Sequence, residues 1–452
     1  MSDRVHFIGV GGSGMSAVAH LMAARGVEVS GSDASVSKYF KALQAAGLDV
    51  RQGHDPAWVD GAARVVISTA VRESNPELTR ARETGVPVWH RSEALVAALE
   101  GQQLVAVAGS HGKTTTSAMV AHLLHRSGID ASFAVGATVL GVDGAVAGGY
   151  AGSAGLAVVE ADESDGSFLR YHPQIAVLTN VEADHLDHYG TEAALDEAFV
   201  AFATDARTLV VCVDDAKAAS IGREAKAAGV EVVTYGTGEA DVVVDAHGFT
   251  AGGARYDVTL ALPGAHHRLN AAAAWAAAVA AGADRVAAAA ALESFGGTGR
   301  RYQARGEAGG VRVIDDYAHH PTEVAAVLAA AREAGEGHLV VLFEPMLFTR
   351  TQLHAHAFAE ALSIADADVI VAAVHGDRED PIEGVTAHSI VDHMTVPSGS
   401  TARVVEDLRQ AAETCADIAQ PGDLVLTLGS GPVTQAGDWI LDRVRGRAGA
   451  HE

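Results

Sequence analysis

The sequence predicts an α/β protein of several domains, and two observations carry that prediction. Short runs of β-branched apolar residues alternate with alanine-rich stretches along the 452-residue chain, which is the strand-helix order of α/β folds. The apolar runs are too uniformly hydrophobic for strands with one wet face, which indicates parallel strands covered by helices on both sides. At roughly 150 residues per domain, the length favours about three domains.

The expected strands follow one another along the whole chain. They are residues 5–10, 64–69, 104–109, 156–162, 175–180, 208–213, 231–235, 311–317, 338–345, 368–374 and 423–430. The stretch 254–263 alternates polar and apolar residues after Gly252 and Gly253, so we expect an antiparallel hairpin there. Breaks near 99–103 and 296–299 predict domains at 1–99, 100–297 and 298–452.

Composition and charge exclude several classes of protein. The chain has 57 acidic and 32 basic residues, a formal charge of -25, and a surface of that sign repels nucleic acid. A small phosphorylated ligand is still compatible with this negative charge, because backbone N–H groups can bind its phosphate. Two cysteines, Cys212 and Cys415, make no disulfide framework, and no segment resembles a signal peptide or a membrane span. We therefore expect a cytoplasmic protein without nucleic-acid binding or membrane insertion.

A first glycine-rich loop follows the first expected strand. Gly9, Gly11 and Gly14 match G-x-G-x-x-G and precede a helical stretch, an arrangement that brings a backbone close to a diphosphate. Asp33 ends the next expected strand. In dinucleotide-binding sites, the acid that binds the ribose stands at about this position. The same pattern also occurs in tight strand-to-helix turns that bind no ligand. The loop predicts a bound nucleotide diphosphate.

A second loop predicts ATP binding. Gly109-Ser110-His111-Gly112-Lys113-Thr114-Thr115 follows an apolar strand and precedes a helix, which is the P-loop arrangement with two residues fewer between its glycines. Lys113 would reach phosphate oxygens, and the Thr114 hydroxyl would bind Mg²⁺. A dehydrogenase needs only the first loop and a kinase only the second. A ligase that acts on a nucleotide-linked substrate needs both.

Acids and histidines follow the next strand ends. Glu160 directly ends an apolar strand, and a carboxylate there opposite Thr114 would complete a Mg²⁺ site; a solvated acidic loop is the plain alternative. His185 follows another strand and would bind a second metal or a phosphate, although a lone histidine is more often structural. The scarce cations Arg300, Arg301 and Arg350 are candidates for phosphate or carboxylate contacts.

Four stretches together resemble the Mur ligases: residues 9–14, 109–115, 160–165 and 316–321. The resemblance covers the whole chain. It implies a Rossmann-like N-terminal domain that holds a UDP-sugar, a central P-loop ATPase domain and a C-terminal Rossmann-like domain that places an amino acid. Within the family, residues 6–16 and 297–301 are similar to the member that adds L-alanine. The implied reaction joins L-alanine to the lactyl carboxylate of UDP-N-acetylmuramate through an acyl phosphate, with ATP and Mg²⁺, in peptidoglycan precursor synthesis.

The resemblance also implies roles for individual residues. The ATP-binding set is Gly109, Ser110, His111, Gly112, Lys113, Thr114, Thr115, Asn270, Arg300, Arg301, Asp316 and Tyr317. The UDP-sugar set is Gly11, Gly12, Ser13, Gly14, Asp33 and Ser68. The metal ligands are Thr114, Glu160 and His185, and the catalytic set is Lys113, His185, His319 and Arg350.

The chain departs from the family pattern at several positions. Met346 and Leu347 stand where the family has histidine and arginine, which leaves Arg350 alone in that segment, and His267 stands where asparagine is usual. A sister ligase that adds another amino acid or a tripeptide is the nearest alternative. An NAD-dependent dehydrogenase and a binding-only protein are more distant ones. We expect a monomer or a homodimer.

Overall fold

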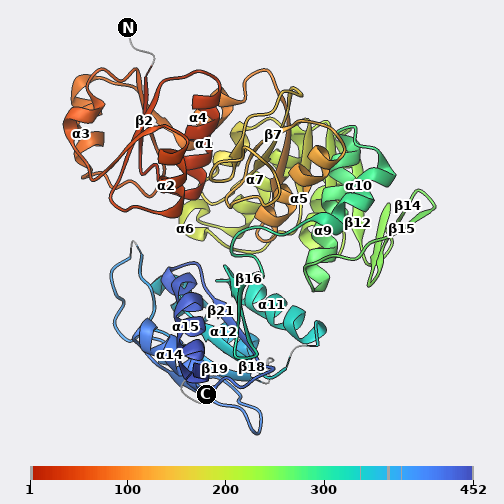
Figure 1. Cartoon of the computed structure of the whole chain (residues 1–452). Helices are drawn as coiled ribbons and strands as arrows, with labels where there is room; N and C mark the ends of the chain where they lie inside the picture. Colours follow the sequence, from red (N-terminus) through yellow and green to blue (C-terminus); the bar gives the residue numbers. More distant parts are fainter. Residues whose placement is uncertain (1–3, 336, 364–366, 378, 450–452) are drawn as a thin grey trace. The chain divides into compact units, whose positions relative to one another are not determined.

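The structure is a computed structural model that describes residues 4–335, 337–363, 367–377 and 379–449 (Figure 1). It divides into two compact units. The first comprises Met1–Ala261 and His267–Thr298, and the second comprises Leu262–His266 and Gly299–Glu452. No helix among the described residues has the length and apolar character needed to cross a bilayer.

The first unit begins with a five-stranded parallel sheet of order β3-β2-β1-β4-β5. Its strands are β1 (Val5–Ile8), β2 (Val29–Asp33), β3 (Asp49–Gln52), β4 (Arg64–Ile67) and β5 (Val88–His90). Its helices are α1 (Ser13–Ala24), α2 (Lys38–Ala45), the 3-10 helix η1 (Pro56–Val59), α3 (Pro76–Thr84) and α4 (Arg91–Ala98). Val5 and Phe7 pack with α1 and α4, whereas Ile8 packs with α3, so helices cover both faces of the sheet.

A ten-stranded sheet of order β15-β14-β13-β12-β11-β10-β6-β9-β7-β8 completes the first unit. Its strands are β6 (Gln103–Ala108), β7 (Ser132–Ala134), β8 (Gly149–Tyr150), β9 (Leu156–Glu160), β10 (Ile175–Leu178), β11 (Thr208–Cys212), β12 (Glu231–Gly236), β13 (Val242–Asp245), β14 (Gly248–Ala251) and β15 (Ala254–Asp257). Neighbours from β13 to β7 are parallel, and antiparallel strands stand at both edges.

Helices surround this second sheet. They are α5 (Lys113–Arg126), the 3-10 helix η2 (Ser167–Arg170), α6 (Leu186–Tyr189), α7 (Glu192–Asp205), α8 (Ala216–Ala227), α9 (Ala265–Ala280), α10 (Arg285–Ala291) and the 3-10 helix η3 (Leu292–Ser294). One buried apolar cluster includes Phe7 and Leu21 as well as Phe199 and Val211. Residues before and after position 100 therefore share a core, which accounts for their placement in one compact unit.

The second unit holds a six-stranded sheet of order β16-β17-β21-β18-β19-β20, parallel except for the β16–β17 pair. Its strands are β16 (Gln303–Ala308), β17 (Val311–Asp316), β18 (Leu339–Phe343), β19 (Ala367–Val371), β20 (Ala402–Val404) and β21 (Leu424–Leu428). Its helices are α11 (Pro321–Glu333), α12 (Phe348–Ser363), α13 (His388–Val391), α14 (Leu408–Ile418), the 3-10 helix η4 (Pro432–Gln435) and α15 (Ala436–Gly449).

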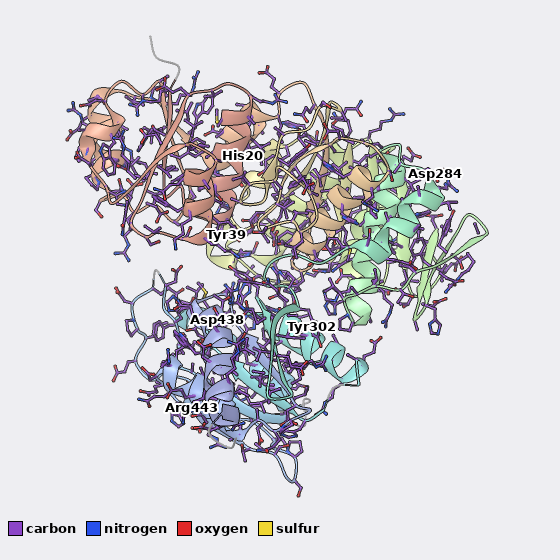
Figure 2. The ribbon with its side chains drawn as sticks, in the orientation of Figure 1. His20, Tyr39, Asp284, Tyr302, Asp438 and Arg443 are labelled. Carbon is purple, nitrogen blue, oxygen red and sulfur yellow. The ribbon has the colours of Figure 1, made fainter. Side chains whose placement is uncertain are left out.

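Local sequence signals explain where several helices begin. The Asp284 side chain, labelled in Figure 2, accepts hydrogen bonds from the backbone N–H groups of Val286 and Ala287 and so caps α10. Asn75 caps α3 in the same way, and Pro321 occupies the first turn of α11, where its missing N–H costs nothing. These caps fix the directions in which the helices leave the sheet edges.

The predicted α/β class is confirmed, and the predicted strands appear near their expected positions. The expected hairpin is antiparallel, but β15 ends at Asp257 rather than near residue 263. Its partner β14 begins at Gly248, which pairs with Asp257, so no strand residue remains to pair with the chain beyond that point. The two predicted domain boundaries stay a prediction.

Candidate active site

The second glycine-rich loop joins the end of β6 to the start of α5. Gly109 and Gly112 have φ angles of +129° and +82°, which side chains rarely adopt. A Cβ at Gly109 would lie 2.1 Å from Thr179 Oγ1, and one at Gly112 would lie 2.7 Å from Asn270 Oδ1. Both glycines are therefore required by close neighbours. The structure places Asn270 of α9 directly beside the loop.

Lys113 folds back into this loop. Its Nζ donates to the carbonyl oxygens of Gly109 at 2.7 Å and Ser110 at 3.2 Å, and it pairs with Glu163 at 2.9 Å. Burial disfavours the ammonium charge, but the carboxylates of Glu163 and Asp162 outweigh it and raise the pKa of Lys113. The lysine is thus a fixed cation at the mouth of a loop of backbone N–H groups. That combination suits a phosphate chain.

Thr114 and Glu160 form a pair of oxygen ligands next to the lysine. Thr114 Oγ1 donates to Glu160 Oε1 at 2.9 Å, and the other carboxylate oxygen accepts from the Gly136 N–H at 2.7 Å. A hydroxyl beside a carboxylate that the backbone holds in place offers the hard oxygen ligands that Mg²⁺ prefers. His185 pairs with Asp184 at 3.7 Å and, among the described residues, shares no hydrogen bond or ion pair with Glu160.

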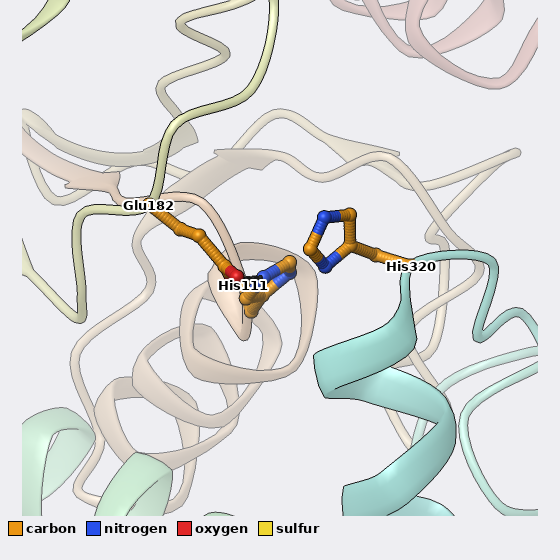
Figure 3. Close-up of side chains that lie close together, drawn as sticks. All are labelled: His111, Glu182 and His320. Carbon is orange, nitrogen blue, oxygen red and sulfur yellow. Dashed lines mark hydrogen bonds and ion pairs between the residues drawn. The ribbon is translucent and has the colours of Figure 1, made fainter. Parts of the chain in front are cut away.

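The strand end of β10 braces the same loop. The His111 N–H donates to Asn180 Oδ1 at 2.8 Å, and Thr179 Oγ1 donates to the His111 carbonyl at 2.6 Å. The His111 ring contacts Glu182 with 2.6 Å between Nε2 and Oε2, marked by the dashed line in Figure 3. Figure 3 also labels His320, which precedes α11 in the second unit. These contacts fix the loop to the residues that follow β10.

The first glycine-rich loop lies at the carboxyl end of β1. The Gly11 N–H donates to Asp33 Oδ2 at 2.9 Å, and a Cβ at Gly11 would lie 2.9 Å from that oxygen. Ser68 follows β4, the neighbour of β1 on the side away from β2. Chain order reverses between β1 and β4, which is where open parallel sheets bind ligands. Gly12, Ser13 and Gly14 begin α1 there, so the predicted UDP-sugar residues gather at one edge.

Arg91, which the sequence did not single out, links the first glycine-rich loop to the acidic segment that follows β9, within the first unit. A Cβ at Gly14 would lie 2.3 Å from its Nη1, and its Nη2 is 3.4 Å from Asp162 Oδ2. His90 pairs in addition with Asp165 at 3.2 Å. A guanidinium between the first glycine-rich loop and the acids that follow β9 could hold an anionic group of a ligand. Its only sequence signal is an arginine at the start of a helix.

The second unit holds the other predicted residues. Arg300 is tied to its own unit: its Nε donates to Asp315 at 3.3 Å, and its terminal nitrogens donate to the carbonyls of Ser430 and Gly429. Arg301 pairs with Glu323 at 3.6 Å. Both guanidinia lie over the Tyr317 ring, at 4.9 and 5.0 Å. Tyr317 therefore gathers two guanidinium groups, whose positive charge could attract an anionic ligand group.

Asp316 ends β17 and is buried. Its two oxygens accept from the N–H groups of Tyr302 at 2.7 Å and Ala318 at 2.8 Å. Burial raises the pKa of Asp316 to about 6, against the lowering effect of Arg301. His319 next to it is held through Nδ1 by the Tyr317 carbonyl at 3.0 Å and by Glu323 at 3.2 Å. Asp316 and His319 are therefore held in place by residues of the second unit.

The departures at Met346 and Leu347 have a local structural role. The Met346 sulfur accepts from the Ser430 hydroxyl, and Leu347 has φ +68° while its N–H donates to the His375 carbonyl at 2.9 Å. These residues make the turn that begins α12. Arg350 lies in the first turn of that helix and is half-buried.

Three family models match consecutive parts of the chain. They are "Mur ligase family, catalytic domain" over residues 4–103, "Mur ligase middle domain" over 107–278, and "Mur ligase, glutamate ligase domain" over 300–431. The chain belongs to the Mur ligase family. The predicted resemblance is therefore confirmed.

This Mur ligase is similar over nearly its whole length to curated relatives. It is 49% identical over 455 residues to the UDP-N-acetylmuramate--L-alanine ligase of Renibacterium salmoninarum, covering 97% of this chain and 95% of that protein. Identity to the protein of the same name from Kineococcus radiotolerans is 48% over 455 residues, with 97% and 96% covered.

Solved structures agree with these relatives. The UDP-N-acetylmuramate-alanine ligase of Thermotoga maritima matches this Mur ligase with a TM-score of 0.82 at 28% identity, covering 98% of this chain and 99% of that one. A murein peptide ligase from Psychrobacter arcticus matches with a TM-score of 0.71 at 24% identity, covering 98% of each chain. The second likeness concerns the fold alone.

Proposed function

We propose that this Mur ligase joins L-alanine to the lactyl carboxylate of UDP-N-acetylmuramate, with hydrolysis of ATP to ADP and phosphate, in peptidoglycan precursor synthesis. The observation that carries the proposal is the near-full-length identity of 48–49% to relatives that bear this activity in their names. Sister ligases share the fold with much lower identity, which favours L-alanine over another amino acid.

The phosphate loop supports a role in ATP binding. The loop from Gly109 to Thr115 would bind the phosphates through the N–H groups at the start of α5 and the ammonium of Lys113, with Lys113 leaving Glu163 for a phosphate oxygen. Thr114 and Glu160 would hold Mg²⁺, which neutralises phosphate charge when bound. Asn270 beside Gly112 would contact the nucleotide. His185 is proposed as a catalytic residue that binds a second metal or the acyl phosphate.

The reaction requires an anionic acceptor close to these phosphates. The lactyl carboxylate would attack the γ-phosphorus to give an acyl phosphate, and the alanine amine would then displace phosphate to form the amide. We place the UDP part at the first loop, with Asp33 and Ser68 flanking it, and the sugar side toward Arg91. His319 and Arg350 are proposed to serve the amino acid and the reacting carboxylate, and Arg300, Arg301, Asp316 and Tyr317 the nucleotide.

The cytoplasm is the proposed compartment, because the reaction uses ATP and because Cys212 and Cys415 are both free thiols in the structure. The predicted monomer or homodimer stays a prediction.

The test is phosphate release from Mg-ATP in the presence of UDP-N-acetylmuramate, with L-alanine, glycine, D-glutamate or a muramyl-type tripeptide as acceptor. We expect release that requires both the sugar nucleotide and L-alanine, with the amide product identified by its mass. Release with another acceptor would move the chain to a sister activity. Absence of release with every acceptor, while the folded protein binds ADP, would contradict the proposal and favour a binding-only protein.

A further inference from the structure

A cavity of about 550 Å³ lies at the edge of the ten-stranded sheet opposite the phosphate loop. Gln103, Ile175, Thr208 and Glu231 line it, and they are the first residues of β6, β10, β11 and β12, four adjacent strands. The phosphate loop follows the last residue of β6, roughly 17 Å away along the strand. The cavity is therefore separate from the site described above, and its volume suits a small-molecule ligand.

The floor of the cavity is apolar. It is formed by α9 through Trp275, Ala276 and Val279. The indole N–H of Trp275 already donates to the Arg285 carbonyl at 2.9 Å, and its ring packs against Phe249 with centroids 4.9 Å apart. The indole thus offers the cavity an aromatic surface and no further donor.

The acceptors on the cavity wall already have partners. Glu231 accepts from Thr208 Oγ1 at 3.2 Å, and Asp241 accepts from the Thr234 N–H and hydroxyl at 2.9 and 2.7 Å. The Gln174 Oε1 accepts from the Leu104 N–H at 2.6 Å, which orients the amide and leaves its NH₂ group as a donor.

Two arginines, Arg207 and Arg285, also line the cavity. Arg207 immediately precedes β11, and Arg285 is the first residue of α10. A Cβ at Gly252 would lie 3.2 Å from Arg285 Nη1, which places that guanidinium against the turn between β14 and β15 at the cavity rim. In the part of the chain that the structure describes, neither guanidinium makes a hydrogen bond or an ion pair. In a chain of formal charge -25, two such cations at one cavity stand out.

We infer that this cavity binds a small amphipathic anion, with its phosphate or carboxylate held by Arg207 and Arg285 and its apolar body on Trp275 and Val279. The guanidinium groups of Arg207 and Arg285 attract a negative charge, and the α9 floor accommodates an apolar group. This inference goes beyond the proposed ligase activity; its coupling to the KM for ATP rests on that proposed function, whereas binding of the anion does not.

Helix α9 connects the cavity to the ATP site. The same helix carries Asn270 beside Gly112 at one end and Val279 at the cavity, a rise of roughly 13 Å. A ligand that packs on Trp275 and Val279 therefore bears on the helix that supports the phosphate loop. We expect occupation of the cavity to change the KM for ATP.

The experiment uses phenyl phosphate as the probe, with the full chain saturated by ADP and UDP-N-acetylmuramate so that both glycine-rich loops are occupied. Isothermal titration is expected to give one site per chain. The Arg207→Ala/Arg285→Ala variant should bind at least about tenfold more weakly, because two charge-assisted contacts are removed. Arg223→Ala, an exposed arginine of α8 away from the cavity, is the matched control and should bind as the unaltered chain does. Inorganic phosphate should bind several-fold more weakly than phenyl phosphate.

Unchanged affinity in the double variant, or no detectable binding at millimolar phenyl phosphate, would overturn the site. Equal affinity for inorganic phosphate would overturn the role of the apolar floor. Initial rates at varied ATP then test the coupling: saturating phenyl phosphate should shift the KM for ATP at least about twofold in the unaltered chain and not in the double variant. An identical shift in both would assign the effect to competition at the phosphate loop and overturn the coupling.

Discussion

The two glycine-rich loops have the same local architecture and different chemistry. Each follows a buried parallel strand and begins a helix, β1 to α1 in one case and β6 to α5 in the other. In the first loop, the Gly11 N–H is bonded to a carboxylate, that of Asp33. In the second, a lysine lies in the loop, and a threonine and a glutamate form a pair of oxygen ligands beside it.

This difference teaches that glycines alone do not specify a ligand. The turn and the helix N-terminus provide a general anion site in both places. Side chains from neighbouring strand ends decide the rest: Asp33 suits the hydroxyls of a ribose, whereas Lys113 and Glu160 suit a triphosphate with its metal. Substitutions at each loop should therefore affect one substrate and spare the other.

The largest effect is expected for Lys113→Ala. Removal of a buried cation from the phosphate loop should lower kcat by about 10³-fold or more, since the phosphates lose their principal charge partner. Steady-state rates measure this. Because Glu163 would lose its partner, Lys113→Ala/Glu163→Gln separates catalysis from stability and should be equally inactive while remaining folded. Lys226→Ala, an exposed lysine of α8, is the control; activity retained in the Lys113 variants would contradict the assignment.

Glu160→Gln should give the next largest effect and should act through the metal. The amide keeps a hydrogen bond to Thr114 but loses the charge that favours a divalent cation. The Mg²⁺ concentration for half-maximal rate should rise by about tenfold or more, with a smaller change in the KM for the sugar nucleotide. A titration of rate against Mg²⁺ decides it, and an unaltered Mg²⁺ dependence would exclude Glu160 as a ligand.

Gly11→Ala should affect the other loop selectively. Its Cβ would lie 2.9 Å from Asp33 Oδ2, so the aspartate must move. We expect the KM for UDP-N-acetylmuramate to rise by about tenfold, with the KM for ATP unchanged. Gly238→Ala, at a glycine of the first unit that has open space around it and no positive φ, controls for a glycine substitution. A rise in both KM values would show that the loops are not independent.

The last prediction concerns the end of β17, a strand that is not followed by a glycine-rich loop. Burial raises the pKa of Asp316 to about 6 from 3.8, so the folded chain takes up this proton at higher pH than the unfolded chain. Stability from this group therefore increases as pH falls from about 6 to 4, by at most about 3 kcal/mol. Denaturant unfolding of Asp316→Asn should lack that part of the pH dependence. Asp438→Asn, at an exposed aspartate, should retain it, and parallel pH profiles for all three chains would contradict the pKa.

Sequence reasoning identified the features that depend on local pattern. Buried strands, both glycine-rich loops and the placement of Glu160 at a strand end follow from periodicity and turn chemistry, and the structure joins Glu160 to Thr114 as expected. The same reasoning could not show which of the four acids in residues 160–165 pairs with Lys113. Which of them meets Lys113 depends on the path of the loop after β9, and that acid is Glu163.

Contacts between segments far apart in the chain could not be predicted from the sequence. Arg91 reaches Gly14 and Asp162 because β5 ends near the acidic loop, a tertiary fact without a local signal. Arg300 looked like an available cation, whereas carbonyl groups about 130 positions later in the chain already hold it. His185 also falls in this group, since its neighbours are set by the turn that begins α6.

The most direct test of the division between the loops is a crossed titration. Isothermal titration would measure ADP and UDP-N-acetylmuramate binding to Lys113→Ala and to Gly11→Ala. The account predicts that Lys113→Ala loses ADP affinity by about tenfold or more and keeps the sugar nucleotide within twofold, and that Gly11→Ala shows the reverse. Equal losses of both ligands in either variant would contradict the account.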